Sequence, residues 1–345
     1  MQTKIIEVNP QHPEKEKIEQ AAKIIKAGGL VAFPTETVYG LGADALNKDS
    51  FKKIYGAKNR PSDNPIIVHV ARKEDLKEIV ANVPEIAEIL IKKFWPGPLT
   101  LLFKKKKNVP APKGMDTIAV RMPSHKIALA LIKNSAPIAA PSANLSGKPS
   151  PTTAQHVIDD LNGRIDMIID GGPVEIGVES TVLDITKKVP MILRPGGVTY
   201  EQLKKVLGKI EIHPSINSRL KLKRVASPGM KYRHYAPNAE MIVFEGKEKN
   251  IVKKINDMVG RYENKKVGIL ATKETAAKYS KHFMVKVMGS RKIPKSIAKN
   301  LFSMLREFDK EDVQIIFAEG ISTSGIGLGV MNRIRKAAGY RIVEA

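Results

Sequence analysis

One loop early in the chain combines hydroxyls, a carboxylate and glycines in a pattern that suits a small polar ligand. After the apolar stretch 30–33 the sequence continues as Pro34-Thr35-Glu36-Thr37-Val38-Tyr39-Gly40-Leu41-Gly42. Hydroxyl groups can hydrogen-bond a polar ligand, and glycines allow it to approach backbone N–H groups closely. An ordinary polar turn is the alternative interpretation. The loop is therefore a candidate ligand site.

A lysine and an arginine follow in a second polar segment. Lys58 and Arg60 are separated by one residue and followed by Pro61, with Asn64 and His69 farther along the chain. Arginine binds phosphate as a planar fork and lysine as a point charge, so this stiffened pair could hold a triphosphate. A solvated basic turn competes with that interpretation. A lone histidine such as His69 is more often structural than a ligand.

Arg121 follows apolar residues, where an unpaired charge would be costly. Thr117 lies four residues earlier in the predicted strand 117–121, so the two side chains share one face of it. The guanidinium therefore needs an anion. A carboxylate of the protein or one on a substrate would serve.

Two further segments place small polar residues or a cation at the ends of predicted strands. The segment 140–147, Ala-Pro-Ser-Ala-Asn-Leu-Ser-Gly, follows the apolar strand 137–140, and α/β sheets bind ligands at the carboxyl ends of their strands. Ser180 precedes another strand. Arg194 ends a strand before Pro195-Gly196-Gly197 and is a candidate phosphate clamp. Ordinary turns, and a surface arginine, are the alternatives.

Several classes of chemistry are excluded by composition and motif. The 345 residues contain no cysteine, which rules out disulfides, thiolate nucleophiles and cysteine-ligated metals. The seven histidines are scattered, so we expect no metal site. The glycines of Gly325-Ile326-Gly327-Leu328-Gly329 lack dinucleotide-loop spacing and are interpreted as a structural turn. The N-terminus has no apolar signal core and no run is long enough for a membrane span, which predicts a cytoplasmic protein without membrane contact.

The net charge of +23 is unevenly distributed. Residues 1–205 carry +8 and residues 206–345 carry +15, of which segment 251–300 alone contributes +10. Such an excess favours polyanionic partners, with lysine-rich solubility as the alternative. Aromatic residues make up only 5%, which weakens a purely RNA-binding role because such proteins use stacking rings. Direct contact with RNA stays open as a property of the second half.

Alternating apolar patterns predict an α/β protein with two domains. In the first part the predicted strands are 4–8, 30–33, 65–70, 99–103, 117–121, 137–140, 167–170, 181–185 and 191–194, and the predicted helices are 14–26, 49–55, 74–81, 84–94, 125–134, 153–161 and 201–207. In the second part strands are predicted at 241–244, 267–270, 283–287 and 313–318, and helices at 250–259, 274–281, 296–308 and 331–338. The first pattern indicates a large mixed sheet, and the second a small parallel, Rossmann-like sheet.

These patterns place a domain at 1–207, a linker at 208–238 and a second domain at 239–345. The linker has proline and polar residues with little periodicity. It also contains Met230, Tyr232, His234 and Tyr235, which indicates that it packs onto something.

The order of the motifs resembles one family closely. PTETVYGLG, KNRPSDNPIIVH, WPGPLT, TIAVRMP, PSANLSGKPSPTT, ESTVLD, RPGG and SPGMKYRHYAP are similar to the YrdC-type threonylcarbamoyl-AMP synthases, in their long, two-domain form. The resemblance covers about 4–345. It implies a YrdC-like twisted mixed sheet with helices, followed by the Rossmann-like domain.

The resemblance also implies a nucleotidyltransferase reaction. L-Threonine, bicarbonate or CO₂, and ATP give L-threonylcarbamoyl-AMP and pyrophosphate, and a downstream transferase complex passes the threonylcarbamoyl group to the tRNA adenosine next to the anticodon. No protein nucleophile is needed. Catalysis would rest on positioning and on neutralising phosphate charge, with Mg²⁺ accompanying ATP and no protein-bound transition metal. A carbamoyl-adenylating maturation protein is the other enzyme considered, but its zinc-finger module needs cysteines.

The same resemblance assigns roles to residues. Lys58 and Arg60 are the expected catalytic pair. Threonine would be held by Thr35, His69, Arg121, Ala140 and Ser180, and ATP by Lys58, Asn64, Thr117, Ser142, Asn144, Ser150, Arg194 and Tyr235. Arg121 would pair with the threonine carboxylate. Tyr232 competes with Tyr235 for the last role.

The resemblance further implies that the linker folds back over the pocket and protects a labile intermediate from water. Deleting Ser227–Pro237 should then strongly reduce synthesis while both domains stay folded. Two domains and a lid need no partner subunit, so we expect a monomer.

Overall fold

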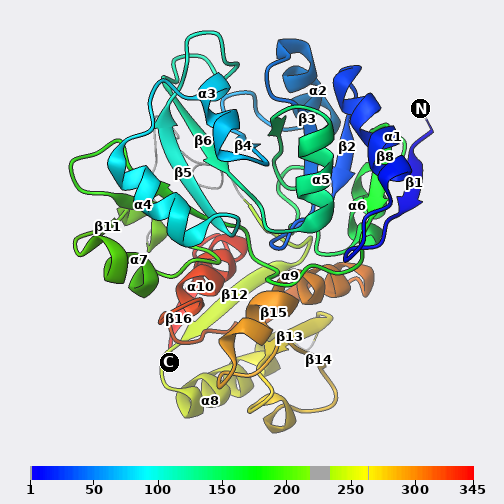
Figure 1. The fold of residues 1–345 in the computed structure, drawn as a ribbon. Helices are drawn as coiled ribbons and strands as arrows, with labels where there is room; N and C mark the ends of the chain where they lie inside the picture. The colour runs from blue at the N-terminus through cyan, green and yellow to red at the C-terminus, as the bar shows by residue number, and fades with distance from the viewer. Residues whose placement is uncertain (1, 218–233, 263) are drawn as a thin grey trace. The chain divides into compact units, whose positions relative to one another are not determined.

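The computed structural model describes residues 2–217, 234–262 and 264–345. They fall into two compact units (Figure 1). The first unit contains residues 2–146 and 150–216, and the second contains 147–149, 217 and the described part of 234–345. Much of the predicted linker 208–238, Tyr232 included, lies outside the described residues, so its boundaries and its role stay predictions.

The first unit is built on one mixed sheet, as predicted. Its strand order is β1-β8-β2-β3-β7-β4-β6-β5-β9-β10-β11. The strands are β1 (Lys4–Glu7), β2 (Val31–Phe33), β3 (Gly40–Asp44), β4 (Ile67–His69), β5 (Leu99–Lys104), β6 (Thr117–Arg121), β7 (Ile138–Ala139), β8 (Met167–Asp170), β9 (Thr181–Asp184), β10 (Met191–Arg194) and β11 (Glu211–Ile212). The helices are α1 (Lys15–Lys26), α2 (Lys48–Lys58), α3 (Leu76–Ile79), α4 (Glu85–Phe94), α5 (Lys126–Asn134), α6 (Ala154–Leu161) and α7 (Tyr200–Leu207).

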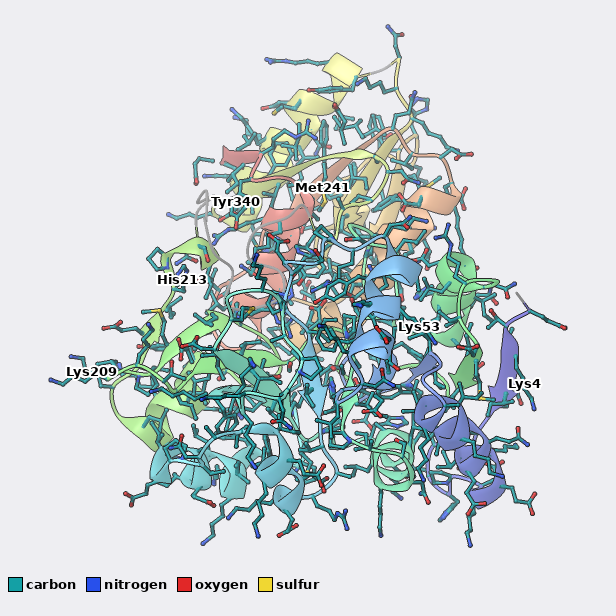
Figure 2. All side chains as sticks on the ribbon, turned by 90° about the horizontal axis from the view of Figure 1, so that it is seen from above. Lys4, Lys53, Lys209, His213, Met241 and Tyr340 are labelled. Atoms are coloured by element: carbon teal, nitrogen blue, oxygen red, sulfur yellow. The ribbon has the colours of Figure 1, made fainter. Side chains whose placement is uncertain are left out.

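Apolar helix faces cover this sheet. Ile18, Ala21, Ala22 and Ile25 of α1 recur at helical spacing and are buried together with residues of α5, β2 and β8. Figure 2 shows the side chains of the described residues, with Lys4 on the edge strand β1. Lys53 of α2 donates to the carbonyl of Gly28, just beyond the end of α1, at 2.7 Å.

The second unit is a five-stranded sheet in the order β14-β13-β15-β12-β16, and every pairing in it is parallel. This confirms the predicted Rossmann-like architecture. The strands are β12 (Glu240–Glu245), β13 (Val267–Ala271), β14 (Met284–Val287), β15 (Ile315–Glu319) and β16 (Ile342–Glu344), and the helices are α8 (Glu248–Val259), α9 (Pro294–Lys310) and α10 (Gly327–Ala337). Phe244, Ile255, Ile269 and Phe317 belong to its buried core.

The predicted helix 274–281 is wrong. The structure has only a 3₁₀ turn, Ala276–Lys278, in this segment. The side chains of Thr275 and Tyr279 both donate to the carboxylate of Glu319, which draws the segment into a tight turn instead of a helix. Periodicity records apolar spacing and does not register such a polar anchor.

Other boundaries also need correction. Gly40 and Gly42, expected in a loop, pair with β2 as part of β3. The helix expected at 331–338 begins at Gly327, where a Cβ atom would lie 2.0 Å from the carbonyl oxygen of Ser322. The helix expected at 49–55 begins at Lys48, and its N-cap is Asn47, whose side chain accepts from two backbone N–H groups.

Candidate functional site

Two neighbouring parallel strands bring His69 and Arg121 together. The register of β4 and β6 pairs these two residues, each the last of its strand. The His69 ring packs edge-on against Phe33, with centroids 6.5 Å apart. Burial and the nearby Arg121 charge lower the pKa of His69 to about 3, so the ring is uncharged at neutral pH. The carboxyl ends of strands are where α/β sheets bind ligands.

Arg121 is buried and held from several sides. Its Nε donates to the carbonyl of Gly97 at 3.2 Å, and its Nη1 donates to the hydroxyl of Thr37 at 2.9 Å. Its Nη2 lies 2.7 Å from Oε1 of Glu36, and both side chains are 4% exposed. The anion required by Arg121 is thus a protein carboxylate in this structure. The sequence had left open whether the protein or a substrate would supply it.

Thr35 shapes the loop that carries Glu36 and Thr37. This loop joins β2 to β3, and the Thr35 hydroxyl donates to the carbonyl of Val38 at 2.6 Å. The same oxygen accepts from the backbone N–H groups of Thr37 and Val38, each at 3.2 Å. A side chain that bonds its own backbone in this way fixes a turn. Thr35 therefore positions its neighbours.

Lys58 joins the end of α2 to the loop after β7. Its ammonium donates to the carbonyl of Ser142 at 2.5 Å and to the carbonyl of Asn144. The backbone N–H of Ser146 donates to the carbonyl of Lys58 at 2.9 Å. The structure thus brings together three residues assigned to ATP, and Lys58 is only 1% exposed.

Arg60 closes the loop that carries Asn64. Its Nη2 donates to the carbonyl of Pro65 at 2.7 Å, and Tyr55 donates its hydroxyl to the carbonyl of Asn64 at 3.2 Å. Asn64 is 1% exposed, and neither polar atom of its side chain has a hydrogen-bond partner among the described residues. A buried amide in that state is uncommon and points to a ligand site.

Ser180 and Arg194 form a third group. Nη2 of Arg194 donates to the Ser180 hydroxyl at 3.1 Å, and Nε donates to the Ser180 carbonyl at the same distance. The Ser180 hydroxyl also lies 2.7 Å from that of Thr100 on β5. Ser150 donates to Oε1 of Glu179 at 2.6 Å. Both serines and both charged side chains are buried.

The remaining predicted residues lie in different surroundings. The backbone N–H of Ala140 donates to the carbonyl of Ile67 at 2.9 Å, which sets it beside β4. Thr117, at the start of β6, lines a small cavity. Tyr235 belongs to the second unit, where it is buried and stacks on Phe302 of α9 with centroids 5.4 Å apart.

Sequence reasoning missed the acidic and hydroxyl partners of these groups: Glu36, Thr37, Thr100 and Glu179. A signal for Glu36 was present, because a buried Arg121 needs an anion and Glu36 is the carboxylate of the neighbouring polar loop. The sequence contained no such signal for Thr100, because nothing in it indicates that β5 and β9 are neighbours.

Two cavities lie apart from the predicted residues. One of about 500 Å³ is lined by Glu7, His125, Asp170 and Glu175 among others. The other, of about 580 Å³, is lined by Lys48, Lys52, Lys105, Lys107 and Lys113 together with aromatic and proline side chains. Within the described ranges, no three histidine, aspartate or glutamate side chains are grouped so that they could hold a metal ion. No helix there is long and apolar enough to cross a membrane.

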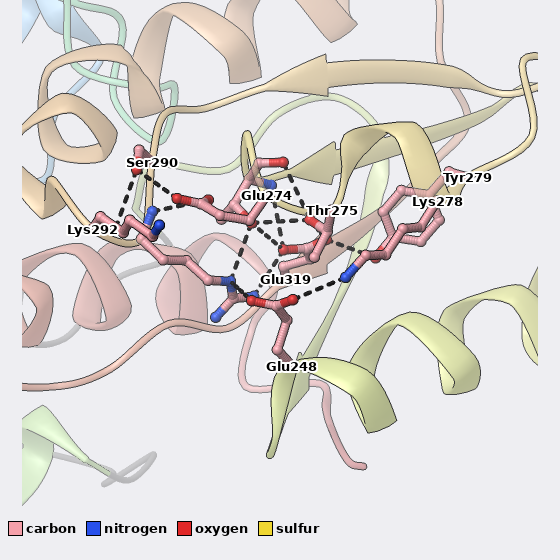
Figure 3. A network of polar contacts seen from close by, with 10 residues as sticks. Glu248, Glu274, Thr275, Lys278, Tyr279, Ser290, Lys292 and Glu319 are labelled. Carbon is pink, nitrogen blue, oxygen red and sulfur yellow. Dashed lines mark hydrogen bonds and ion pairs between the residues drawn. The ribbon is translucent and has the colours of Figure 1, made fainter.

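A buried carboxylate in the second unit provides a contrast with Glu36. Glu319 accepts hydrogen bonds from the side chains of Thr272, Thr275, Tyr279 and Arg291 (Figure 3). Both of its oxygens therefore have donors. The network has a structural role at the end of β15. Burial and the neighbouring Glu319 charge raise the pKa of Tyr279, which keeps its hydroxyl a donor.

Comparison with known proteins agrees with these features. Residues 23–196 match the family model Sua5_yciO_yrdC, described as "Telomere recombination", and residues 198–339 match the model of the threonylcarbamoyl-AMP synthase C-terminal domain. The chain is 51% identical to a threonylcarbamoyl-AMP synthase of Pyrococcus abyssi over 96% of each chain. It is 48% identical to one of Bacillus subtilis over 95% of this chain and 94% of that one. The crystal structure of P. abyssi Sua5 complexed with L-threonine is similar with a TM-score of 0.95 and 50% identity, over 99% of this chain and 100% of that one.

The mixed sheet, the parallel second unit and the buried polar site define a two-unit YrdC-like α/β protein. The chain belongs to the threonylcarbamoyl-AMP synthase family. This confirms the family, the fold class, the function and the enzyme class predicted from the motifs.

Proposed function

We propose that the first unit condenses L-threonine, bicarbonate or CO₂, and ATP into L-threonylcarbamoyl-AMP and pyrophosphate at the ends of β4, β6 and β7. The observation that carries this assignment is the group of buried polar side chains there. Polar atoms of Glu36, Asn64 and His69, and Nη2 of Arg121, have no hydrogen-bond partner among the described residues. Buried polar groups are normally satisfied, so this group suits a ligand rich in donors and acceptors.

In this proposal the cations divide between the two substrates. Lys58 and Arg194 are buried beside loops that contain Ser142, Asn144 and Ser180, and they would neutralise charge on the triphosphate. Arg60 and Asn64 would line the same region, and Thr117, Ser150 and Tyr235 remain proposed ATP contacts. No residue needs to form a bond with substrate, because the threonine nitrogen attacks carbon and the resulting carbamate attacks the α-phosphorus.

The threonine side of the site would contain Thr35, His69, Arg121, Ala140 and Ser180. Neutral His69 can offer or accept a hydrogen bond without adding charge to the pocket. The Ser180 hydroxyl is already oriented by Arg194 and Thr100, so it can position a small polar group. Preorganisation of this kind lowers the cost of aligning the reacting atoms.

The finer partners belong to the same proposal. Mg²⁺ would enter with ATP and be held mainly by its phosphates and water, which suits this ion. A separate transferase complex would consume the product at tRNA. We also propose that the enzyme is monomeric and cytoplasmic, with direct RNA contact confined to the basic second unit.

Pyrophosphate release tests the proposal. The purified chain is incubated with ATP, Mg²⁺ and bicarbonate, with and without L-threonine. Release should depend on threonine, and the variant Arg194→Met should reduce it by at least about a hundredfold, because a buried charge beside the triphosphate is lost. Pyrophosphate release that does not depend on threonine, or no release at all, would overturn the proposed reaction.

A further inference from the structure

Glu36 and Arg121 form an ion pair whose hydrogen bonding is incomplete. Their charged atoms are 2.7 Å apart and both side chains are 4% exposed. Even so, Oε1 and Oε2 of Glu36 and Nη2 of Arg121 take part in no hydrogen bond within the described ranges. Close contact without directed hydrogen bonds leaves donor and acceptor capacity unused in a buried place, where it is costly.

From this geometry, and resting on the proposed function, we propose that Glu36 binds the ammonium group of the amino-acid substrate. The threonine zwitterion exchanges with the internal pair: its carboxylate accepts from Nη2 of Arg121, and its ammonium donates to Glu36. Each unsatisfied atom of the pair then receives a partner of the opposite kind.

The two ends of the pair are held by separate elements, so the Glu36 carboxylate can separate from Nη2 while Arg121 stays anchored. Nε and Nη1 of Arg121 are anchored to Gly97 and Thr37, which leaves Nη2 as the end that faces Glu36. On the other side, the turn around Thr35 holds the loop that carries Glu36. The ligand carboxylate would then meet an anchored Arg121, and only the side chain of Glu36 would need to turn to reach the ammonium.

Charge balance explains why a zwitterion suits this place. The Glu36–Arg121 pair is neutral as a whole, and an inserted zwitterion keeps it so. A ligand with a carboxylate alone would leave the Glu36 charge buried without a cation, which is strongly unfavourable. His69 cannot supply that cation, because burial and Arg121 keep its pKa at about 3. The site therefore selects ligands that carry an amine.

The second unit contains a buried carboxylate with a structural role, which can be compared with Glu36. Glu319 is fully buried, and its oxygens accept from Thr272, Thr275, Tyr279 and Arg291 (Figure 3). Glu36 is buried almost as deeply and has no such set of donors. The difference assigns Glu36 to ligand binding and not to the framework.

The test measures binding of two ligands to the full chain by calorimetry. One is L-threonine, and the other is 2,3-dihydroxybutyrate of matching stereochemistry, in which a hydroxyl replaces the ammonium. Glu36→Gln should weaken L-threonine binding by about tenfold to a hundredfold, the value of a charge-assisted hydrogen bond. It should also tighten binding of the dihydroxy acid, because Arg121 then lacks a competing anion.

A change in the relative affinities for L-threonine and the dihydroxy acid distinguishes ammonium binding by Glu36 from a structural role. If Glu36→Gln weakens both ligands equally, or leaves threonine binding unchanged, the ammonium assignment is wrong. The exposed Glu175→Gln is the matched control and should behave as the unaltered chain. Glu36→Asp, which keeps the charge, should keep the preference for threonine and decides the question if Glu36→Gln fails to fold. An unaltered chain that binds ATP but no threonine would instead overturn the proposed function.

Discussion

The buried cations of the first unit are satisfied in two different ways. Lys58 donates to backbone carbonyls of the loop 141–146 and so ties two segments of the fold together. Arg121 instead meets a carboxylate that is itself short of hydrogen bonds. The first arrangement is typical of a structural clasp as well as a phosphate site. The second, the Arg121–Glu36 pair, is typical of side chains that bind a ligand.

His69 should make the stability of the first unit depend on pH. Its folded pKa of about 3 lies below the ordinary 6.5, so between these values the unfolded chain binds a proton that the folded chain does not. Stability therefore falls as pH drops below 6.5, by about 2 kcal/mol at pH 5 for this group alone.

The variant His69→Gln removes that contribution. Between pH 7 and pH 5, its free energy of unfolding should fall by about 2 kcal/mol less than that of the unaltered chain. Urea titrations at both pH values, which follow the unfolding of the first unit, measure the difference. The same pH slope in both proteins would contradict the buried, neutral histidine.

At the scale of elements, neighbouring strand ends and loops assemble the site. The order β3-β7-β4-β6-β5-β9 sets the loops that carry Glu36, Ser142 and Ser180 near the ends of these strands. Periodicity in the sequence located most of these elements. It missed β3, because this glycine-rich strand has little apolar alternation. It also predicted a helix at 274–281, because periodicity does not register the polar anchor at Glu319.

Gly196 should be essential to the element that presents Ser180. A Cβ atom at Gly196 would lie 2.1 Å from the carbonyl oxygen of Glu179 and 2.7 Å from the backbone nitrogen of Thr181. Backbone cannot yield as a side chain does, so Gly196→Ala should destabilise the first unit by about 1–3 kcal/mol and displace Ser180. Thermal unfolding and threonine binding measure the two effects.

Gly56 in α2 provides the matched control for that substitution. It is exposed, and a Cβ atom there would meet nothing within 4 Å. Gly56→Ala should be stabilising by about 0.5–1 kcal/mol through helix propensity, with threonine binding unchanged. Equal effects at the two glycines would show that contact with 179–181 is unimportant.

At the scale of the molecule, the two units carry different tasks. Of the predicted site residues, Tyr235 alone lies in the second unit, where Phe302 and the guanidinium of Arg333 cover its ring. Segment 251–300 of that unit alone contributes +10 to the net charge, whereas the buried carboxylate of Glu319 is satisfied by donors of the same unit. The basic side chains of 251–300 are all exposed or half-buried, which distinguishes them from the buried cations of the first unit.

The core of the second unit should be separable from amino-acid binding. Phe317 is fully buried and packs edge-on against Phe244 and Tyr262. Phe317→Ala should cost the second unit about 3–5 kcal/mol, while the affinity of the chain for L-threonine changes by less than about twofold. Calorimetry of unfolding and of binding tests both. A tenfold loss of threonine affinity would show that the second unit supports the amino-acid site.

The order and sequence of the motifs were sufficient to identify the family and the two-part α/β architecture, whereas the assigned site residues stay predictions. Local sequence carries this information, because strand and helix periods and short polar motifs are properties of neighbouring residues. The partners of the key charges came only from the folded chain. Thr37 and Arg121 are 84 positions apart, and Thr100 and Ser180 are 80 apart, yet each pair is hydrogen-bonded. Such contacts depend on strand order, which arises from packing the whole sheet. That order places the loop residue Glu36 beside Arg121, where it serves as the counterion.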